Sequence, residues 1–178
     1  IAGHIENNPR LHEVFPALTP GDLWTQTALS VTREYGVKDP SIQVRGAFSK
    51  ILGVRIDRLI ADDILTLDYT RTKHMRDRMR EWFISELMSR LTAESRVCIL
   101  GNAWHIDDLH HELMKNERWA GLILPVRDPI TGISRWPEVW SQERIADFEA
   151  LRTPAEAARA LDCIAWSDEG SRFRNEWF

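Results

Sequence analysis

Two adjacent carboxylates, Asp62 and Asp63, interrupt an otherwise apolar stretch of the sequence, residues 58–68 (RLIADDILTLD). Burying an unpaired carboxylate is strongly unfavourable because the charged group loses its hydration. The pair therefore needs either water at the end of a strand or a cation. One such acid can hold a divalent cation while its neighbour activates a water molecule for attack. The alternative is a structural cap or turn, which produces the same short pattern.

A second pair of non-apolar residues, comparable to the acidic pair, follows another apolar run further along the chain. Residues 96–102 (RVCILGN) read as a continuous apolar strand that ends in Gly101 and Asn102, the pattern of a fully buried strand in a parallel sheet. Ligands of open α/β sheets gather outside the carboxyl ends of the strands. Both pairs stand at predicted carboxyl ends, so together they mark the candidate site.

The elements that must position these residues alternate along the chain. Strands are predicted over 28–36 and 41–48 around a turn at 38–41, then over 54–62, 96–102 and 120–126. Helices are predicted over about 69–91, over 107–119, and twice more towards the C-terminus. The last of these helices is announced by TPAE, with Thr153 as N-cap and Glu156 as its capping-box partner. This alternation predicts an α/β layered sheet.

Composition limits the classes of function. The 178 residues are 43% hydrophobic and 28% charged, which suits one domain with at most a small appendage and argues against disorder. No apolar run is long enough to cross a bilayer, so we expect no membrane association. The net charge of −4 argues against a general nucleic-acid clamp. The two cysteines, Cys98 and Cys163, are expected to be reduced thiols.

The order of motifs resembles the large terminase subunit of tailed bacteriophages, the ATPase that drives DNA into empty capsids. That family often shows an apolar strand ending in two acids, a long helix, and a strand running into Thr-Arg-Trp-His-x-Asp-Asp-Leu. Residues 102–109 read Asn-Ala-Trp-His-Ile-Asp-Asp-Leu, and five of the defined positions match. Further similar stretches are Trp119 before Leu124-Pro125, RWPEVWSQERI at 135–145, SRFRNEWF at 171–178, LHEVFP at 11–16 and residues 38–63.

The resemblance implies a P-loop NTPase-type fold, with a partly parallel sheet flanked by helices. That sheet would be incomplete, because no G-x-x-x-x-G-K-[ST] loop, the Walker A element, occurs in the sequence. We therefore expect residues 1–166 to be the second half of a terminase ATPase domain, with the phosphate loop upstream of Ile1. Residues 167–178 would be a linker toward a nuclease domain. On this interpretation the chain alone does not turn over ATP.

The resemblance also implies roles for single residues. Asp62 would hold Mg²⁺ as the Walker B acid, and Asp63 would position the attacking water. Asn102 and His105 would serve catalysis at the following strand end, and Trp104 would lie beside the bound ATP. The sequence departs from the family where Asn102 and Ala103 replace Thr and Arg, and where Asp63 is one methylene shorter than the glutamate of many P-loop ATPases.

Partners and location follow from the same resemblance. They would be double-stranded DNA, the portal ring, the small terminase subunit and sibling copies in a homo-oligomeric ring. The motor would work in the cytoplasm of the infected host bacterium. Two other functions remain open at this point. One is a metal-dependent hydrolase that uses the His/Asp cluster at 105–111, and the other is a non-catalytic protein-interaction module.

Overall fold

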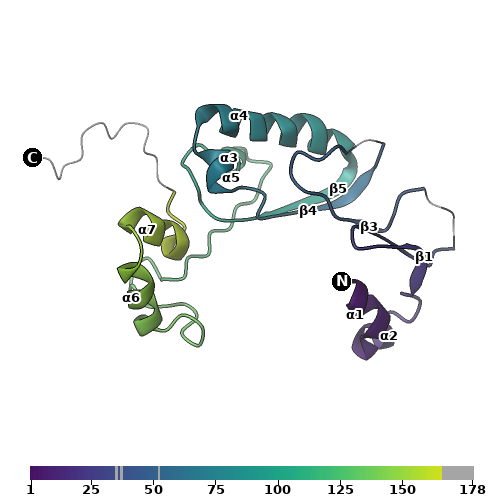
Figure 1. Cartoon of the computed structure of the whole chain (residues 1–178), viewed down its shortest axis with the longest axis horizontal. Helices are drawn as coiled ribbons and strands as arrows, with labels where there is room; N and C mark the ends of the chain where they lie inside the picture. The colour runs from purple at the N-terminus through teal and green to yellow at the C-terminus, as the bar shows by residue number, and fades with distance from the viewer. Residues whose placement is uncertain (35, 37, 52, 166–178) are drawn as a thin grey trace, which may run out of the picture. The chain divides into compact units, whose positions relative to one another are not determined.

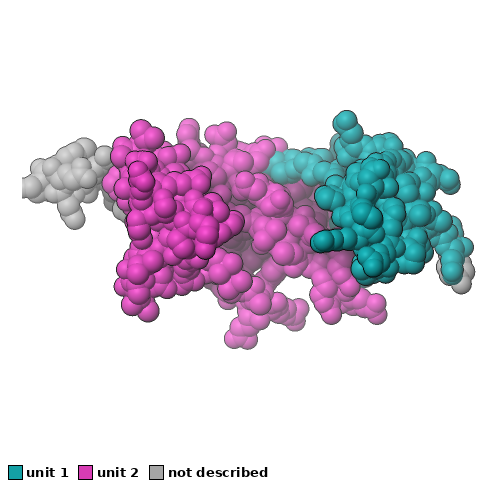
Figure 2. Space-filling model, turned by 90° about the horizontal axis from the view of Figure 1, so that it is seen from below, with its two compact units in different colours: residues 1–56, 90–92 teal, residues 57–89, 93–178 magenta. Residues whose placement is uncertain are grey.

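A computed structural model describes residues 1–165 except 35, 37 and 52, so the expected linker at 167–178 lies outside the described residues. The chain divides into two compact units, coloured separately in Figure 2. The first unit comprises Ile1–Ile56 with Arg90–Thr92. The second comprises Asp57–Ser89 and the residues from Ala93 onward, and it contains both predicted strand ends.

The first unit combines two short helices with a small antiparallel sheet. Its elements are α1 (Ala2–Asn7), α2 (Pro9–Val14), β1 (Pro20–Trp24), β2 (Ala28–Val31) and β3 (Ile42–Gln43). β2 pairs antiparallel with both β1 and β3. The Asn8 side chain caps α2 by accepting hydrogen bonds from the backbone N–H groups of Arg10 and Leu11. The two strands predicted around the turn at 38–41 are thus present but shorter, whereas β1 and both helices were not predicted.

The second unit is built around a two-stranded parallel sheet of β4 (Ile56–Asp62) and β5 (Leu91–Leu100). The helical connection between the strands is nearly continuous: α3 (Leu67–Thr70), α4 (Lys73–Glu81), a π-helical turn η1 (Trp82–Leu87) and a 3₁₀ turn η2 (Met88–Arg90). In Figure 1 α4 runs along the two strands. This strand–helix–strand order confirms that part of the sequence prediction.

Apolar side chains at helical spacing fill the space between this connection and the strands. Met79, Phe83 and Leu87 are buried at steps of four residues, together with Ala61 of β4 and Leu65. The stripe predicted over 69–91 is therefore core. At its start the Thr72 hydroxyl accepts a hydrogen bond from the backbone N–H of Met75, which begins α4.

Two expectations about strands were wrong. β5 is not fully buried, because its burial alternates and one face of the sheet remains exposed, with Ile60 70% and Leu100 50% accessible. In Figure 1 α4 lies along the other face. Residues 120–126 form no strand, and Leu122, Ile123 and Leu124 are exposed. An apolar run becomes a strand only where a neighbour pairs with its backbone, and the described residues offer none there.

Three further helices complete the second unit: α5 (Leu109–Met114), α6 (Gln142–Ala150) and α7 (Pro154–Asp162). α5 is shorter than the predicted helix 107–119. The capping box of Thr153 and Glu156 is present at the start of α7, as predicted. Arg127 connects α6 and α7, because its guanidinium bonds both carboxylate oxygens of Asp162 in α7 and also Glu149 in α6.

The described fold is thus mixed α/β with a small parallel sheet and flanking helices. None of its described helices is long and apolar enough to cross a membrane. Cys98 and Cys163 are both free thiols.

Candidate functional site

The carboxyl ends of β4 and β5 meet at one edge of the parallel sheet. The backbone N–H of Asp63 donates a 3.0 Å hydrogen bond to the carbonyl of Leu100, the last residue of β5. Asp63 has a left-handed backbone (φ 48°), which aspartate tolerates better than most residues. The chain therefore turns sharply at the acidic pair, directly beside the point where Gly101 and Asn102 leave β5.

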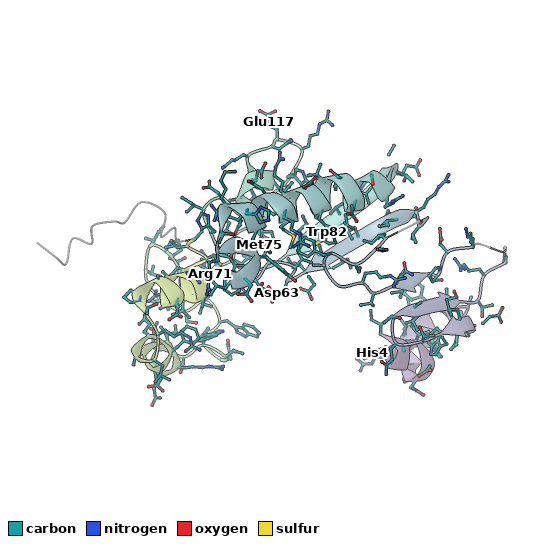
Figure 3. The ribbon with its side chains drawn as sticks, turned by 45° about the horizontal axis from the view of Figure 1, so that its top comes forward. His4, Asp63, Arg71, Met75, Trp82 and Glu117 are labelled. Atoms are coloured by element: carbon teal, nitrogen blue, oxygen red, sulfur yellow. The ribbon has the colours of Figure 1, made fainter. Side chains whose placement is uncertain are left out.

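Both acidic side chains at this edge face solvent. Asp62 and Asp63 are exposed, and within the described residues no hydrogen bond or ion pair involves either carboxylate. In Figure 3 Asp63 lies below the helical stretch that carries Met75 and Trp82. The question raised by an apolar strand with two acids is thereby answered in part. The carboxylates avoid burial because the strand stops there, and their oxygens are free to bind a cation.

The loop that leaves β5 is organised by a different acid, Asp108. Its side chain is fully buried and caps α5 by accepting a hydrogen bond from the backbone N–H of His111. The same carboxylate accepts the backbone N–H groups of Trp104 and His105, at 3.0 and 3.1 Å. Burial raises the pKa of this carboxyl, but the hydrogen bonds outweigh it and the pKa is lowered. The ionised carboxylate therefore fixes the loop in one conformation.

His111 completes this arrangement with its side chain. Its Nδ1 lies 2.8 Å from Oδ1 of Asp108, and the hydrogen bond to that carboxylate raises the pKa of the imidazole despite partial burial. When His111 is protonated, its charge balances the buried charge of Asp108. The helix that follows the loop is thus connected to it through both its backbone and a side chain.

His110 connects the loop to the acidic pair, and sequence reasoning missed it. Its ring packs so closely on Gly101 that a Cβ there would lie 2.5 Å from the imidazole Cε1. Asp108 and, more weakly, Asp63 attract the charged form of the ring. Burial nevertheless lowers the pKa of His110, which favours the neutral ring. A glycine at the end of a strand was the only sequence signal for this contact.

The structure places the predicted site residues in unequal positions. Asp63 and Asn102 come together at the strand ends, and Asn102 is exposed there. Trp104 is half-buried within the loop. His105 is buried, and its Nδ1 accepts the backbone N–H of Asp107 at 3.0 Å. That bond gives His105 a role in shaping the loop. Its side chain is buried, whereas direct contact with a substrate requires an exposed side chain.

The His/Asp cluster at 105–111 does not form a metal centre. Across the described ranges no group of three His, Cys, Asp or Glu side chains is arranged to hold a metal ion. Asp108 and His111 bond each other, and the ring of His110 packs against Gly101. These side chains stabilise the loop, so the metal-dependent hydrolase is not favoured by their geometry.

Comparison with known proteins adds no assignment. No protein-family model matches the chain, and no curated protein matches it. The functional inference therefore depends on the geometry of the strand ends and on the motif resemblance.

Proposed function

We propose that this chain is the second half of the ATPase domain of a phage terminase large subunit, with a P-loop-type sheet. One observation carries the proposal: two exposed acids end a strand directly beside the end of its parallel neighbour, from which the loop Asn102–Asp108 departs. P-loop ATPases place their metal-binding acid and phosphate-contacting residues at such an edge. The resemblance in motif order supports the same conclusion.

The donor set at this edge suits magnesium. Carboxylate oxygens and water are the ligands that Mg²⁺ prefers, and Asp62 offers an exposed carboxylate that binds no other described residue. When bound, Mg²⁺ neutralises negative charge on the phosphates of ATP. Asp62 would hold this ion, in keeping with the Walker B acid of the resembling family.

The residues of the chain then act on water and on the phosphate chain. Asp63 positions the water for in-line attack on the γ-phosphate and accepts its proton. Asn102, exposed at the end of β5, contacts the phosphates through its amide. His110 holds the strand end in place by packing on Gly101. His105 and Asp108 give the loop its fixed shape. Trp104 is part of that loop and lies beside the nucleotide.

The exposed face of the sheet also supports this proposal. Parallel strands of α/β proteins are covered on both faces, yet Ile60 and Leu100 remain accessible here. A phosphate-binding half of the domain would complete such a sheet. Double-stranded DNA, the portal ring, the small terminase subunit and neighbouring copies in a ring would be the partners of the complete motor in the host bacterium.

Substitution of the two acids tests the proposal in the full-length protein. We expect Asp62→Asn and Asp63→Asn each to lower kcat for ATP hydrolysis by about 10²-fold or more, because metal binding and water activation are lost. Asp63→Glu should retain activity, since it restores the longer acid of many P-loop ATPases. Asp107→Asn is the matched control, because Asp107 is an exposed acid on the loop that leaves β5. Full turnover in both asparagine variants would overturn the assignment.

A further inference from the structure

A pair of side chains brings the loop after β5 into contact with helix α7. The guanidinium of Arg159 lies over the indole of Trp104, 5.6 Å from the ring centroid. Trp104 Nε1 and Arg159 Nε are both buried, and among the described residues neither atom has a hydrogen-bond partner. A cation–π contact strengthens when it is shielded from water. The stacking of these two side chains is therefore the interaction that joins loop and helix here.

Trp104 is fixed to the candidate site at its backbone. Its N–H and that of His105 are held by the buried carboxylate of Asp108. The same loop begins at Gly101, beside Asp63 and under the ring of His110. A change at the strand ends that shifts Asn102 must therefore displace the indole or strain these hydrogen bonds.

Arg159 is fixed to a larger body at the other end of the contact. The neighbouring Leu161 is fully buried, and its carbonyl accepts the backbone N–H of Val126 at 2.7 Å. Asp162 receives the two-pronged bond from Arg127, which also bonds Glu149 of α6. A movement of Arg159 therefore carries α7, and α6 is coupled to α7 through Arg127.

We propose that Trp104 and Arg159 form a positioning link that transmits the occupancy of the strand-end site to the helix pair α6–α7. The inference rests on the proposed function, because it takes Mg²⁺ and ATP as the occupants. Binding would shift the loop, the loop would move the indole, and Arg159 would pass the change to α7. Arg159 touches neither the acids nor the phosphates in this scheme, so it acts only through Trp104.

Hydrogen exchange of the full-length protein tests the link, with Mg²⁺ and a non-hydrolysable ATP analogue as the probe. In the wild type we expect the ligand to change exchange in residues 101–108 and also in α7, the latter by about fivefold or more. In Arg159→Met the loop should respond as before while the response of α7 disappears. Arg159→Lys should restore part of it, because the cation remains.

Arg152→Met is the matched control. Arg152 also stacks on an aromatic ring, with its guanidinium 3.6 Å from the centroid of Phe148, but that contact does not involve the loop. The α7 response should persist in this variant, which separates the link from a general loss of arginine stacking. Circular dichroism of the free variants establishes that each remains folded.

The outcomes separate the two proposals. If the wild-type loop responds and α7 does not, or if α7 responds equally in Arg159→Met, the link is overturned and the ATPase assignment stands. If Arg159→Met does not fold, Arg159→Lys takes its place in the test. A weakened α7 response in Arg159→Lys supports the link, and an unchanged response overturns it. If neither loop nor helix responds in the wild type, both the proposed function and the link fail.

Discussion

The acids at the end of β4 and the acid at the start of α5 differ in almost every physical respect. Asp62 and Asp63 are exposed, and no described residue bonds their carboxylates. Asp108 is fully buried, and its carboxylate accepts hydrogen bonds from three backbone N–H groups and one imidazole. The same side chain thus leaves its binding capacity open in one place and uses it entirely for structure in the other.

This difference separates two roles that the sequence presents alike. A carboxylate whose oxygens already accept hydrogen bonds has little capacity left to bind a ligand. Two adjacent exposed carboxylates repel each other and are stabilised by a bound cation. Asp-Asp occurs at 62–63 and again at 107–108, so residue type alone does not distinguish them. Burial and hydrogen bonding do: the first pair is exposed and open to a ligand, whereas Asp108 of the second pair is buried and shapes the loop.

The largest effect is expected from removing the buried acid. Asp108→Ala should lower the free energy of unfolding by ~3–5 kcal/mol, because buried N–H groups and a charged imidazole lose their partner. Urea denaturation measures the change. Asp107→Ala, at the exposed neighbour, should alter stability by about 0.5 kcal/mol or less. Similar losses in the two variants would contradict the contrast between structural and exposed acids.

The packing of His110 of α5 on Gly101 at the strand end is expected to give the next largest effect on the free energy of unfolding. Gly101→Ala should cost ~1–3 kcal/mol, because the new Cβ would lie 2.5 Å from the His110 ring and the ring or the strand end would have to shift. Adding His110→Ala should remove most of that extra cost, a coupling that a double-mutant cycle measures. Gly46→Ala is the control, since a Cβ there meets nothing within 4 Å. Additive losses would show that the ring does not hold the strand end.

A smaller effect depends on pH and tests the charge on His111. The pKa of His111 is raised above its usual 6.5, so its contribution is complete below that pH and disappears as pH rises through the folded-state pKa. The pKa of Asp108 is lowered from 3.8, so its contribution is present above that value and disappears as pH falls through the lowered pKa. The pair should therefore stabilise most between about pH 4 and 6.5.

Unfolding free energies of the wild type and His111→Gln measure this dependence. Their difference should be largest below about pH 6.5 and shrink as pH rises through the raised pKa of His111, because the imidazole of the folded wild type then loses its proton. A difference that does not change with pH would mean that His111 contributes only through neutral hydrogen bonding.

Local signals in the sequence predicted much of this arrangement. Thr153-Pro154 and Glu156 announce the start of α7, because a capping box involves only residues three positions apart. A helix was predicted from residue 107, and in the structure α5 follows its N-cap Asp108. β4 was predicted to end at the acidic pair, and it does.

Features that depend on distant partners could not be predicted. The apolar run of residues 120–126 looks like a strand, yet pairing requires a neighbouring backbone that no local pattern specifies. The exposure of one face of β5 has the same cause, because coverage of a face is a property of the whole fold. The packing of His110 on Gly101 depends on how α5 returns to the strand end, so the sequence could not predict this contact.

The smallest effect on stability, and the sharpest test of the contrast, concerns Asp63. Asp63→Asn should change the unfolding free energy by about 0.5 kcal/mol or less in metal-free buffer, because the carboxylate bonds no described residue and asparagine also tolerates the left-handed backbone. Added Mg²⁺ should in turn stabilise the wild type more than Asp62→Asn, which lacks the carboxylate that would hold the ion, since binding to the folded state raises stability. Thermal unfolding of the wild type and Asp62→Asn with and without Mg²⁺ measures this. Equal responses would mean that the exposed pair does not bind the ion, and exposure alone would not distinguish a chemical acid from an idle one.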